Sequence, residues 1–123
     1  MENEQQFMER RKYKRVEFKE QVKYQSMRFI PQALEGRNLG KTRNAETANI
    51  SAGGIQLIDD VAPEIGQILR MSFKLTDRVK PINAFGRVRW VLFDTAINKY
   101  RFGLEFLYLQ EHNIQQINKL VYN

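Results

Sequence analysis

The sequence contains no cysteine and only one histidine, His112. Disulfide bonds, thiolate zinc sites and metal sites built from several histidines are therefore excluded. No uninterrupted apolar run is longer than that at Trp90–Phe93, whereas a membrane-spanning helix requires about 20 such residues. The N-terminus is polar and acidic with no apolar stretch behind it, so no secretory signal is expected. These absences favour a cytoplasmic protein without membrane insertion.

Residues that carry catalysis are also scarce. A Ser–His–Asp triad would have to use His112 alone, and a single histidine on a helix surface is typically solvated. The acidic pair Asp59 and Asp60 follows a short apolar stretch and is typical of a strand-end turn. Neither GxxxxGK[ST] nor GxGxxG occurs. The sequence therefore predicts a protein that is not an enzyme and holds no cofactor or metal.

Positive charge is concentrated near one end of the chain. The 20 lysines and arginines exceed the 14 acidic residues by six, and five of these basic residues occupy positions 10–15. Without this hexapeptide the net charge falls from +6 to +1. A local cluster of this kind is typical of an anion-binding arm, whereas evenly spread charge indicates only solubility. Arg87, Arg89 and Arg101 are instead interpreted as solvated residues on strand faces.

With 123 residues, the chain is expected to form one domain, 10–123, behind a flexible leader at 1–9. Stretches in which apolar residues alternate with polar ones predict strands. These stretches lie at 16–24, 43–50, 55–59, 69–75, 82–92 and 100–106. Gly86 predicts a bulge, a bend or a close backbone approach within its strand. Residues 31–44 are rich in glycine and asparagine and are expected to form a long loop.

The periodicity changes near the C-terminus. Ile114, Ile117, Leu120 and Val121 follow helical spacing, which predicts an amphipathic helix of about three turns. A series of strands followed by one helix predicts an all-β fold with a C-terminal helix, in which a small antiparallel barrel or sandwich is capped by that helix.

One candidate binding segment lies in the basic cluster. Arg11 and Arg15 are four residues apart, and Arg10 precedes them. Arginine is always charged, its planar guanidinium binds phosphate through two hydrogen bonds, and it also stacks on a purine face. By itself, the segment is better interpreted as a solvated basic leader or a nonspecific nucleic-acid tail.

The second candidate segment is Asn49-x-Ser51-x-x-Gly54, which joins two of the predicted strands. Asparagine and serine supply the hydrogen-bonding groups needed to recognise the edge of a flat heterocycle. Gly54 permits either a positive φ or a close backbone approach. By itself, the segment also fits an ordinary turn, because asparagine, serine and glycine are common there.

Taken in order, these segments resemble the PilZ domain family. RxxxR precedes the first strand, NxSxxG follows the second, and later strands carry Gly86-x-Val88-x-Trp90 and Gly103-x-x-Phe106. The resemblance extends over about residues 9–122. It implies a six-stranded antiparallel β-barrel of the split-barrel type, capped by one C-terminal α-helix.

PilZ domains are bacterial receptors for cyclic di-GMP. By this resemblance, Arg11 and Arg15 are expected to contact phosphate and guanine. Asn49 and Ser51 are expected to contact guanine edges, and Gly54 to shape the turn. Asn49 departs from the aspartate that is more frequent in the family.

The resemblance also bears on stoichiometry and partners. Arg10 resembles the residue found in members that bind cyclic di-GMP as a stacked pair. Ligand-induced ordering of the N-terminal arm would pass the signal to an unidentified downstream protein. Two alternatives stay open: a small basic β-barrel that binds single-stranded nucleic acid, and a ligand-free PilZ-like adaptor. The intact RxxxR and NxSxxG segments argue against the adaptor.

Overall fold

The structure is a computed structural model that describes residues 16–17, 20–30, 35–76 and 80–122. Most of these residues belong to six long strands and one helix. The strands are β2 (Gln21–Ile30), β3 (Glu35–Ile50), β4 (Gly54–Asp59), β5 (Ile68–Phe73), β6 (Ile82–Asp94) and β7 (Lys99–Tyr108), and the helix is α2 (Glu111–Tyr122). A two-residue strand, β1 (Val16–Glu17), precedes them.

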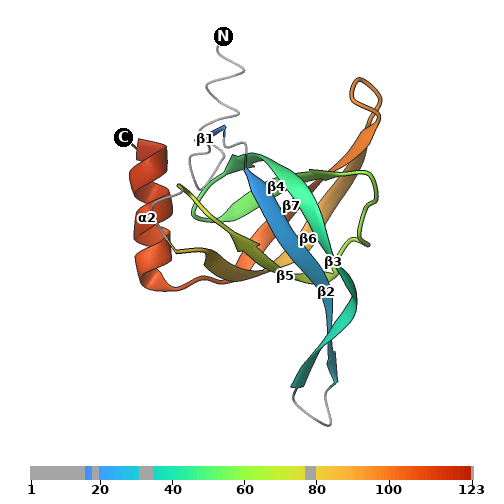
Figure 1. Cartoon of the computed structure of the whole chain (residues 1–123), viewed down its shortest axis with the longest axis horizontal. Coiled ribbons are helices and arrows are strands. Elements are labelled where there is room, and N and C mark those ends of the chain that lie inside the picture. Colours follow the sequence, from blue (N-terminus) through green and yellow to red (C-terminus); the bar gives the residue numbers. More distant parts are fainter. Residues whose placement is uncertain (1–15, 18–19, 31–34, 77–79, 123) are drawn as a thin grey trace.

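The six long strands close into an antiparallel barrel (Figure 1). Each strand pairs with the next in the order β3, β2, β5, β6, β7 and β4, and β4 pairs back to β3. Closure pairs strand edges that an open sheet would expose. The predicted all-β class, with a six-stranded antiparallel barrel and one C-terminal helix, is confirmed.

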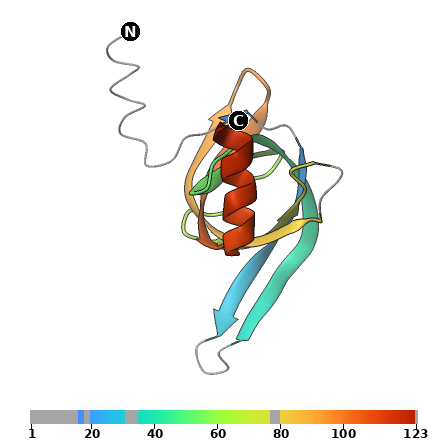
Figure 2. The same cartoon turned by 90° about the vertical axis from the view of Figure 1, so that its left-hand side faces the viewer.

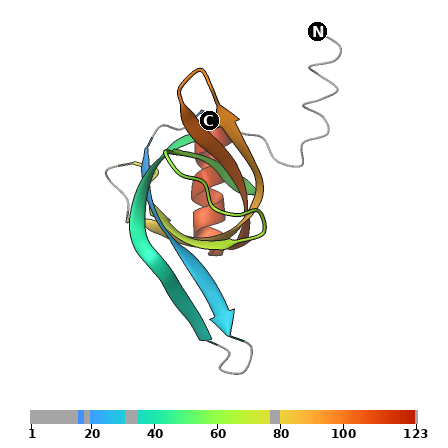
Figure 3. The same ribbon diagram turned by 90° about the vertical axis from the view of Figure 1, so that its right-hand side faces the viewer.

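The C-terminal helix covers one end of the barrel. Figures 2 and 3 view the molecule from opposite sides, and in both α2 lies across the ring of strands. Ile117 and Val121 are buried, while Ile114 and Leu120 are half-buried. The apolar stripe predicted from the helical spacing therefore faces the barrel.

The core follows the alternation of side chains along the strands. On β5, Leu69, Met71 and Phe73 are buried, whereas Arg70 is exposed. Phe102 is fully buried, and complete burial of such a side chain stabilises the fold by about 1.5–3 kcal/mol.

The predicted loop at 31–44 is wrong for most of its length. Strand β3 begins at Glu35, and it pairs with β2 as far as Ile30. The two strands form a ribbon that extends beyond the barrel (Figure 1). Local turn composition predicts a loop, but the antiparallel hydrogen bonds of the hairpin override that preference. Residues 31–34 lie outside the described part of the chain.

The predicted first strand is divided. β1 ends at Glu17 and β2 begins at Gln21, with Glu20 between them. Glu20 donates its N–H to the Thr47 side-chain oxygen at 2.9 Å, and its carbonyl accepts the Thr47 N–H at 2.9 Å. Both backbone polar groups of Glu20 are therefore hydrogen-bonded to Thr47, although Glu20 belongs to neither strand.

The other strands begin and end close to their predicted ranges. The pairing of β6 with β7 shifts register between Phe85 and Gly86. This shift confirms an irregularity at Gly86, and the extra residue, Leu107, lies on the partner strand β7.

Candidate functional site

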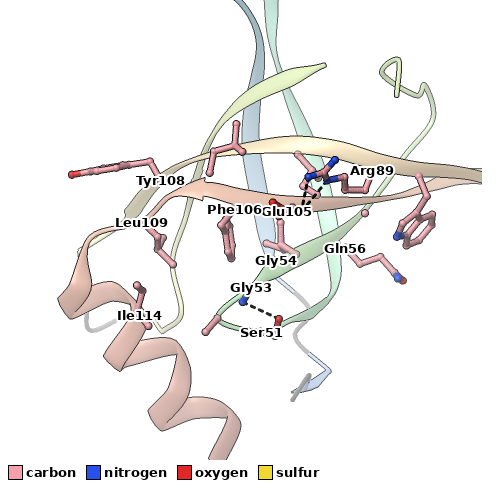
Figure 4. Close-up of a pocket in the computed structure, with 16 residues that line it drawn as sticks. Ser51, Gly53, Gly54, Gln56, Arg89, Glu105, Phe106, Tyr108, Leu109 and Ile114 are labelled. Atoms are coloured by element: carbon pink, nitrogen blue, oxygen red, sulfur yellow. Dashed lines mark hydrogen bonds and ion pairs between the residues drawn. The ribbon is translucent and has the colours of Figure 1, made fainter. Parts of the chain in front are cut away.

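The turn between β3 and β4 is closed by Ser51. This residue is buried, its backbone N–H donates to the Gly54 carbonyl at 2.9 Å, and its hydroxyl accepts the Gly53 N–H at 3.2 Å (Figure 4). A hydroxyl oxygen that accepts one hydrogen bond still carries a proton that it can donate. The turn is thus held rigid, and the hydroxyl keeps a donor.

Gly54 permits a close approach between two strands. A Cβ at this position would lie 2.2 Å from the carbonyl oxygen of Leu104 on β7. The neighbouring Gly53 carbonyl accepts the Phe106 N–H at 3.0 Å. Of the two roles considered for Gly54, the structure supports the close approach, because any side chain here would push β4 away from β7.

Asn49 lies two residues before Ser51, near the end of β3. It is half-buried and pairs with Glu17 of β1 on one side and Gln56 of β4 on the other. The structure therefore brings Asn49 and Ser51 to the same strand end.

A cavity of about 670 Å³ opens beside this turn, between β4, β7 and the start of α2. Its lining consists of Ser51–Gln56, Gly103–Leu109, Arg89, Trp90 and Ile114. Figure 4 shows Ser51 and Gly53 on the turn and Ile114 on the helix. The volume falls in the range of small-molecule sites, about 300–1,000 Å³. Asn49 is not among the lining residues.

The charged groups of this cavity neutralise each other. Arg89 and Glu105 form an ion pair at 2.8 Å, and both side chains are about half exposed. Arg89, interpreted from the sequence as a solvated strand residue, thus lines the cavity as well. The ion pair leaves Arg89 with its charge already neutralised. The charge of an anionic ligand would therefore have to be matched by cations from another part of the chain.

Trp90 and Gly103 form a second tight contact in the wall. They face each other across β6 and β7, and a Cβ on Gly103 would lie 2.1 Å from the indole nitrogen. The indole therefore packs directly over the glycine. This contact accounts for Trp90 of the first glycine-containing strand motif and Gly103 of the second.

The basic segment itself is not described. Arg10, Arg11 and Arg15 lie outside the described residues, as does the predicted leader 1–9. The chain enters the described part at Val16, which pairs with Ile50, the residue before Ser51. Val16, the first described residue after the basic segment, consequently lies beside the β3–β4 turn.

A family model described as PilZ domain matches residues 9–123. The chain belongs to the PilZ domain family. No curated protein matches it. The resemblance inferred from RxxxR, NxSxxG and the two glycine motifs is thereby confirmed at the level of the family.

Solved structures carry the same fold. Bacillus subtilis inhibitor of motility, MotI/DgrA, has a TM-score of 0.75 and 22% identity over 92% of this chain and 50% of that chain. The PilZ domain of Escherichia coli YcgR, solved with c-di-GMP, has a TM-score of 0.62 and 12% identity, covering 92% and 89%. The K. pneumonia MrkH–c-di-GMP complex has a TM-score of 0.64 and 14% identity, and the match covers 92% of this chain and 50% of that chain. The chain thus spans about half the length of MotI/DgrA and MrkH.

This PilZ domain also contains a buried ionic cluster that the sequence analysis missed. Asp59, interpreted as a turn residue, is only 6% exposed. It accepts hydrogen bonds from the Tyr24 hydroxyl at 2.6 Å and from Arg43 Nε at 2.9 Å and Nη2 at 3.1 Å. The three residues lie far apart in the sequence, so no local motif marks the cluster.

The cluster shifts the titration of its members. Burial raises the pKa of Asp59, but the hydrogen bonds from Arg43 and Tyr24 outweigh burial and leave this pKa below its ordinary value. Burial and the hydrogen bond to Asp59 raise the pKa of Tyr24. Both groups are therefore held in the state that favours their hydrogen bond near neutral pH.

Metal and membrane features are absent from the described ranges. Within 16–17, 20–30, 35–76 and 80–122, no three His, Cys, Asp or Glu side chains gather into a potential metal site. The helix among these residues lacks the length and apolar character needed to span a bilayer.

Proposed function

We propose that this PilZ domain is a non-enzymatic receptor for cyclic di-GMP. One observation carries the proposal: the cavity beside the Ser51–Gly54 turn lies where the chain enters from the basic segment, since Val16 pairs with Ile50. The wall brings hydrogen-bonding groups but no surplus charge. Arg11 and Arg15 bring the charge.

The chemistry of the ligand fits this division. Cyclic di-GMP has two phosphodiester charges and two flat guanine rings. Arginine is suited to both, because the guanidinium is cationic and planar. We therefore assign Arg11 and Arg15 to phosphate and guanine contacts, Asn49 and Ser51 to guanine edges, and Gly54 to shaping the turn. The YcgR and MrkH structures with c-di-GMP support the choice of ligand.

The proposed mechanism is a switch. Cyclic di-GMP bridges the N-terminal arm and the barrel, and the ordered arm then presents a new surface to a separate, unidentified protein. The ligand shifts this equilibrium only by its greater affinity for the closed arrangement. Arg10 is assigned to the binding of a stacked pair of ligands.

Thermal denaturation of the full chain tests the ligand. Cyclic di-GMP at about 100 times its Kd should add about 2.7 kcal/mol to the free energy of unfolding, which raises Tm by about 10 °C. GTP and a single-stranded oligonucleotide serve as controls. Stabilisation by the oligonucleotide alone, falling steeply with salt, would instead support the nucleic-acid-binding alternative.

A further inference from the structure

A second cavity shares Tyr108 with the first. It has a volume of about 510 Å³ and lies between β5, β6 and the first turn of α2. Its size is also typical of a small-molecule site.

The second cavity carries a positive charge. Its charged lining residues are Arg70 on β5 and Lys80 before β6, and among the residues that the structure describes no aspartate or glutamate belongs to the lining. Within the described part of the chain, neither cation forms an ion pair. Glu111, in the first turn of α2, is not among the lining residues. The first cavity differs, because its arginine is already paired with a glutamate.

Polar groups converge on the same space from α2. His112, Asn113 and Gln116 line the cavity. Asn113 is 7% exposed and donates from Nδ2 to Gln116 Oε1 at 2.9 Å, so the two amides hold each other in place. The helix begins here, and its N-terminus adds partial positive charge. The helix N-terminus favours an anion, and the amide side chains supply neutral hydrogen-bonding groups.

Aromatic side chains complete the wall. Phe85 is half-buried, and Tyr108 is 57% exposed, so a large part of the tyrosine ring is free to contact a ligand. Two cations match the charge of a phosphate monoester, about −1.5 to −2 at pH 7. We propose that this cavity binds a small aromatic phosphate, of the nucleoside monophosphate class, at a site separate from the proposed cyclic di-GMP site.

Calorimetric titration of the full chain with AMP, inorganic phosphate and adenosine tests this site. We expect saturable binding of AMP and at least about tenfold weaker binding of adenosine, because a charged hydrogen bond contributes about 1.5–3 kcal/mol. Arg70→Gln and Lys80→Gln should each weaken the affinity for AMP about tenfold. Lys74→Gln is the matched control, since Lys74 is exposed, lies four residues beyond Arg70 and does not line the cavity.

Three results would overturn the site: AMP binding that does not saturate, an equal loss in the Lys74 variant, or displacement of AMP by cyclic di-GMP. Arg70 and Lys80 are exposed, so their variants should fold, and circular dichroism checks this. The Arg70→Gln/Lys80→Gln variant should still bind cyclic di-GMP. Absence of AMP binding in the unmodified chain, with cyclic di-GMP binding intact, contradicts this second site only, whereas absence of cyclic di-GMP binding in the unmodified chain contradicts the proposed function.

Discussion

At the scale of single residues, the proposed site divides into a rigid wall and a charged segment. Ser51 fixes the turn through its own backbone and hydroxyl, and Gly54 lets β4 approach β7. The contacts of Ser51 and Gly54 are made within the barrel and do not involve Arg11 or Arg15. Charge recognition is assigned to Arg11 and Arg15, so substitutions in the two parts should have different effects.

Arg15→Ala should abolish measurable binding of cyclic di-GMP. The variant loses a charged hydrogen bond, worth about 1.5–3 kcal/mol, together with stacking on guanine. Calorimetry measures the affinity, and Lys23→Ala, which removes an exposed lysine on β2, is the control. Unchanged affinity in the Arg15 variant would refute its assignment.

Gly54→Ala should destabilise the barrel by about 1–3 kcal/mol, because the new Cβ would lie 2.2 Å from a backbone oxygen. Urea denaturation measures the loss. Gly66 provides a comparison without a steric clash, since no atom lies within 4 Å of a Cβ there, and the cost of a side chain comes only from its positive φ of 90°. We expect Gly66→Asn to cost less than Gly54→Ala; the reverse order would contradict the close approach.

Asp59→Asn should destabilise the fold by about 1–3 kcal/mol, because the Tyr24 hydroxyl loses a buried carboxylate acceptor and Arg43 loses its ion pair. Arg43 is 42% exposed, so solvent limits the loss. Tyr24→Phe removes one hydrogen bond and should cost about 0.5–1.5 kcal/mol. In a double-mutant cycle the two losses should not add; strict additivity would show that the residues act independently.

The same cluster predicts a pH dependence. Since the pKa of Asp59 is lowered in the folded state, its contribution is present above the unfolded value of 3.8 and is lost as the pH falls through the folded pKa. Since the pKa of Tyr24 is raised, its contribution is present below the unfolded value of 10.0 and is lost as the pH rises through the folded pKa. Denaturation curves across pH for the unmodified chain and Tyr24→Phe measure both. An alkaline loss of equal size in Tyr24→Phe would exclude the tyrosine as its source.

At the scale of strands and helices, alternation predicts most of the fold. The strand around Leu69 and the helix around Ile117 were predictable because local periodicity reports burial on one face. The β2–β3 ribbon was not predicted, because its β3 side is rich in turn-forming residues and forms a strand only through its hydrogen bonds with β2. The cluster at Asp59 was also not predicted, because the residues that bind Asp59, Tyr24 and Arg43, come from the separate strands β2 and β3.

The sequence also predicted part of the candidate site. Asn49, Ser51 and Gly54 were selected by their spacing; Ser51 and Gly54 line the cavity and Asn49 does not, and the binding role of all three stays a prediction. The helical wall at Ile114 was missed as a site element, because only the folded barrel brings α2 beside the β3–β4 turn.

The arm provides the prediction at this scale. Cyclic di-GMP should slow amide hydrogen exchange in residues 10–19 and in 49–54, because both segments contact the same ligand in the proposed complex. Exchange measured by mass spectrometry, with GTP as the control ligand, checks this. Protection confined to 49–54 would contradict the proposed bridging by the arm.

At the scale of the whole molecule, the charge distribution helps to distinguish a cyclic di-GMP receptor from a protein that binds single-stranded nucleic acid. The net charge of +6 comes almost entirely from residues 10–15, so a nonspecific polyanion would be held by the basic segment alone. The proposed receptor instead requires the basic segment and the barrel wall together. Binding of a small ligand that depends on Ser51 as well as on Arg15 therefore distinguishes the two.

The most direct measurement is a calorimetric titration of the full chain with cyclic di-GMP, repeated with excess GTP present. The account predicts saturable binding that GTP does not displace, with two ligands per chain if Arg10 holds a stacked pair. Absence of binding, or complete displacement by GTP, would contradict it.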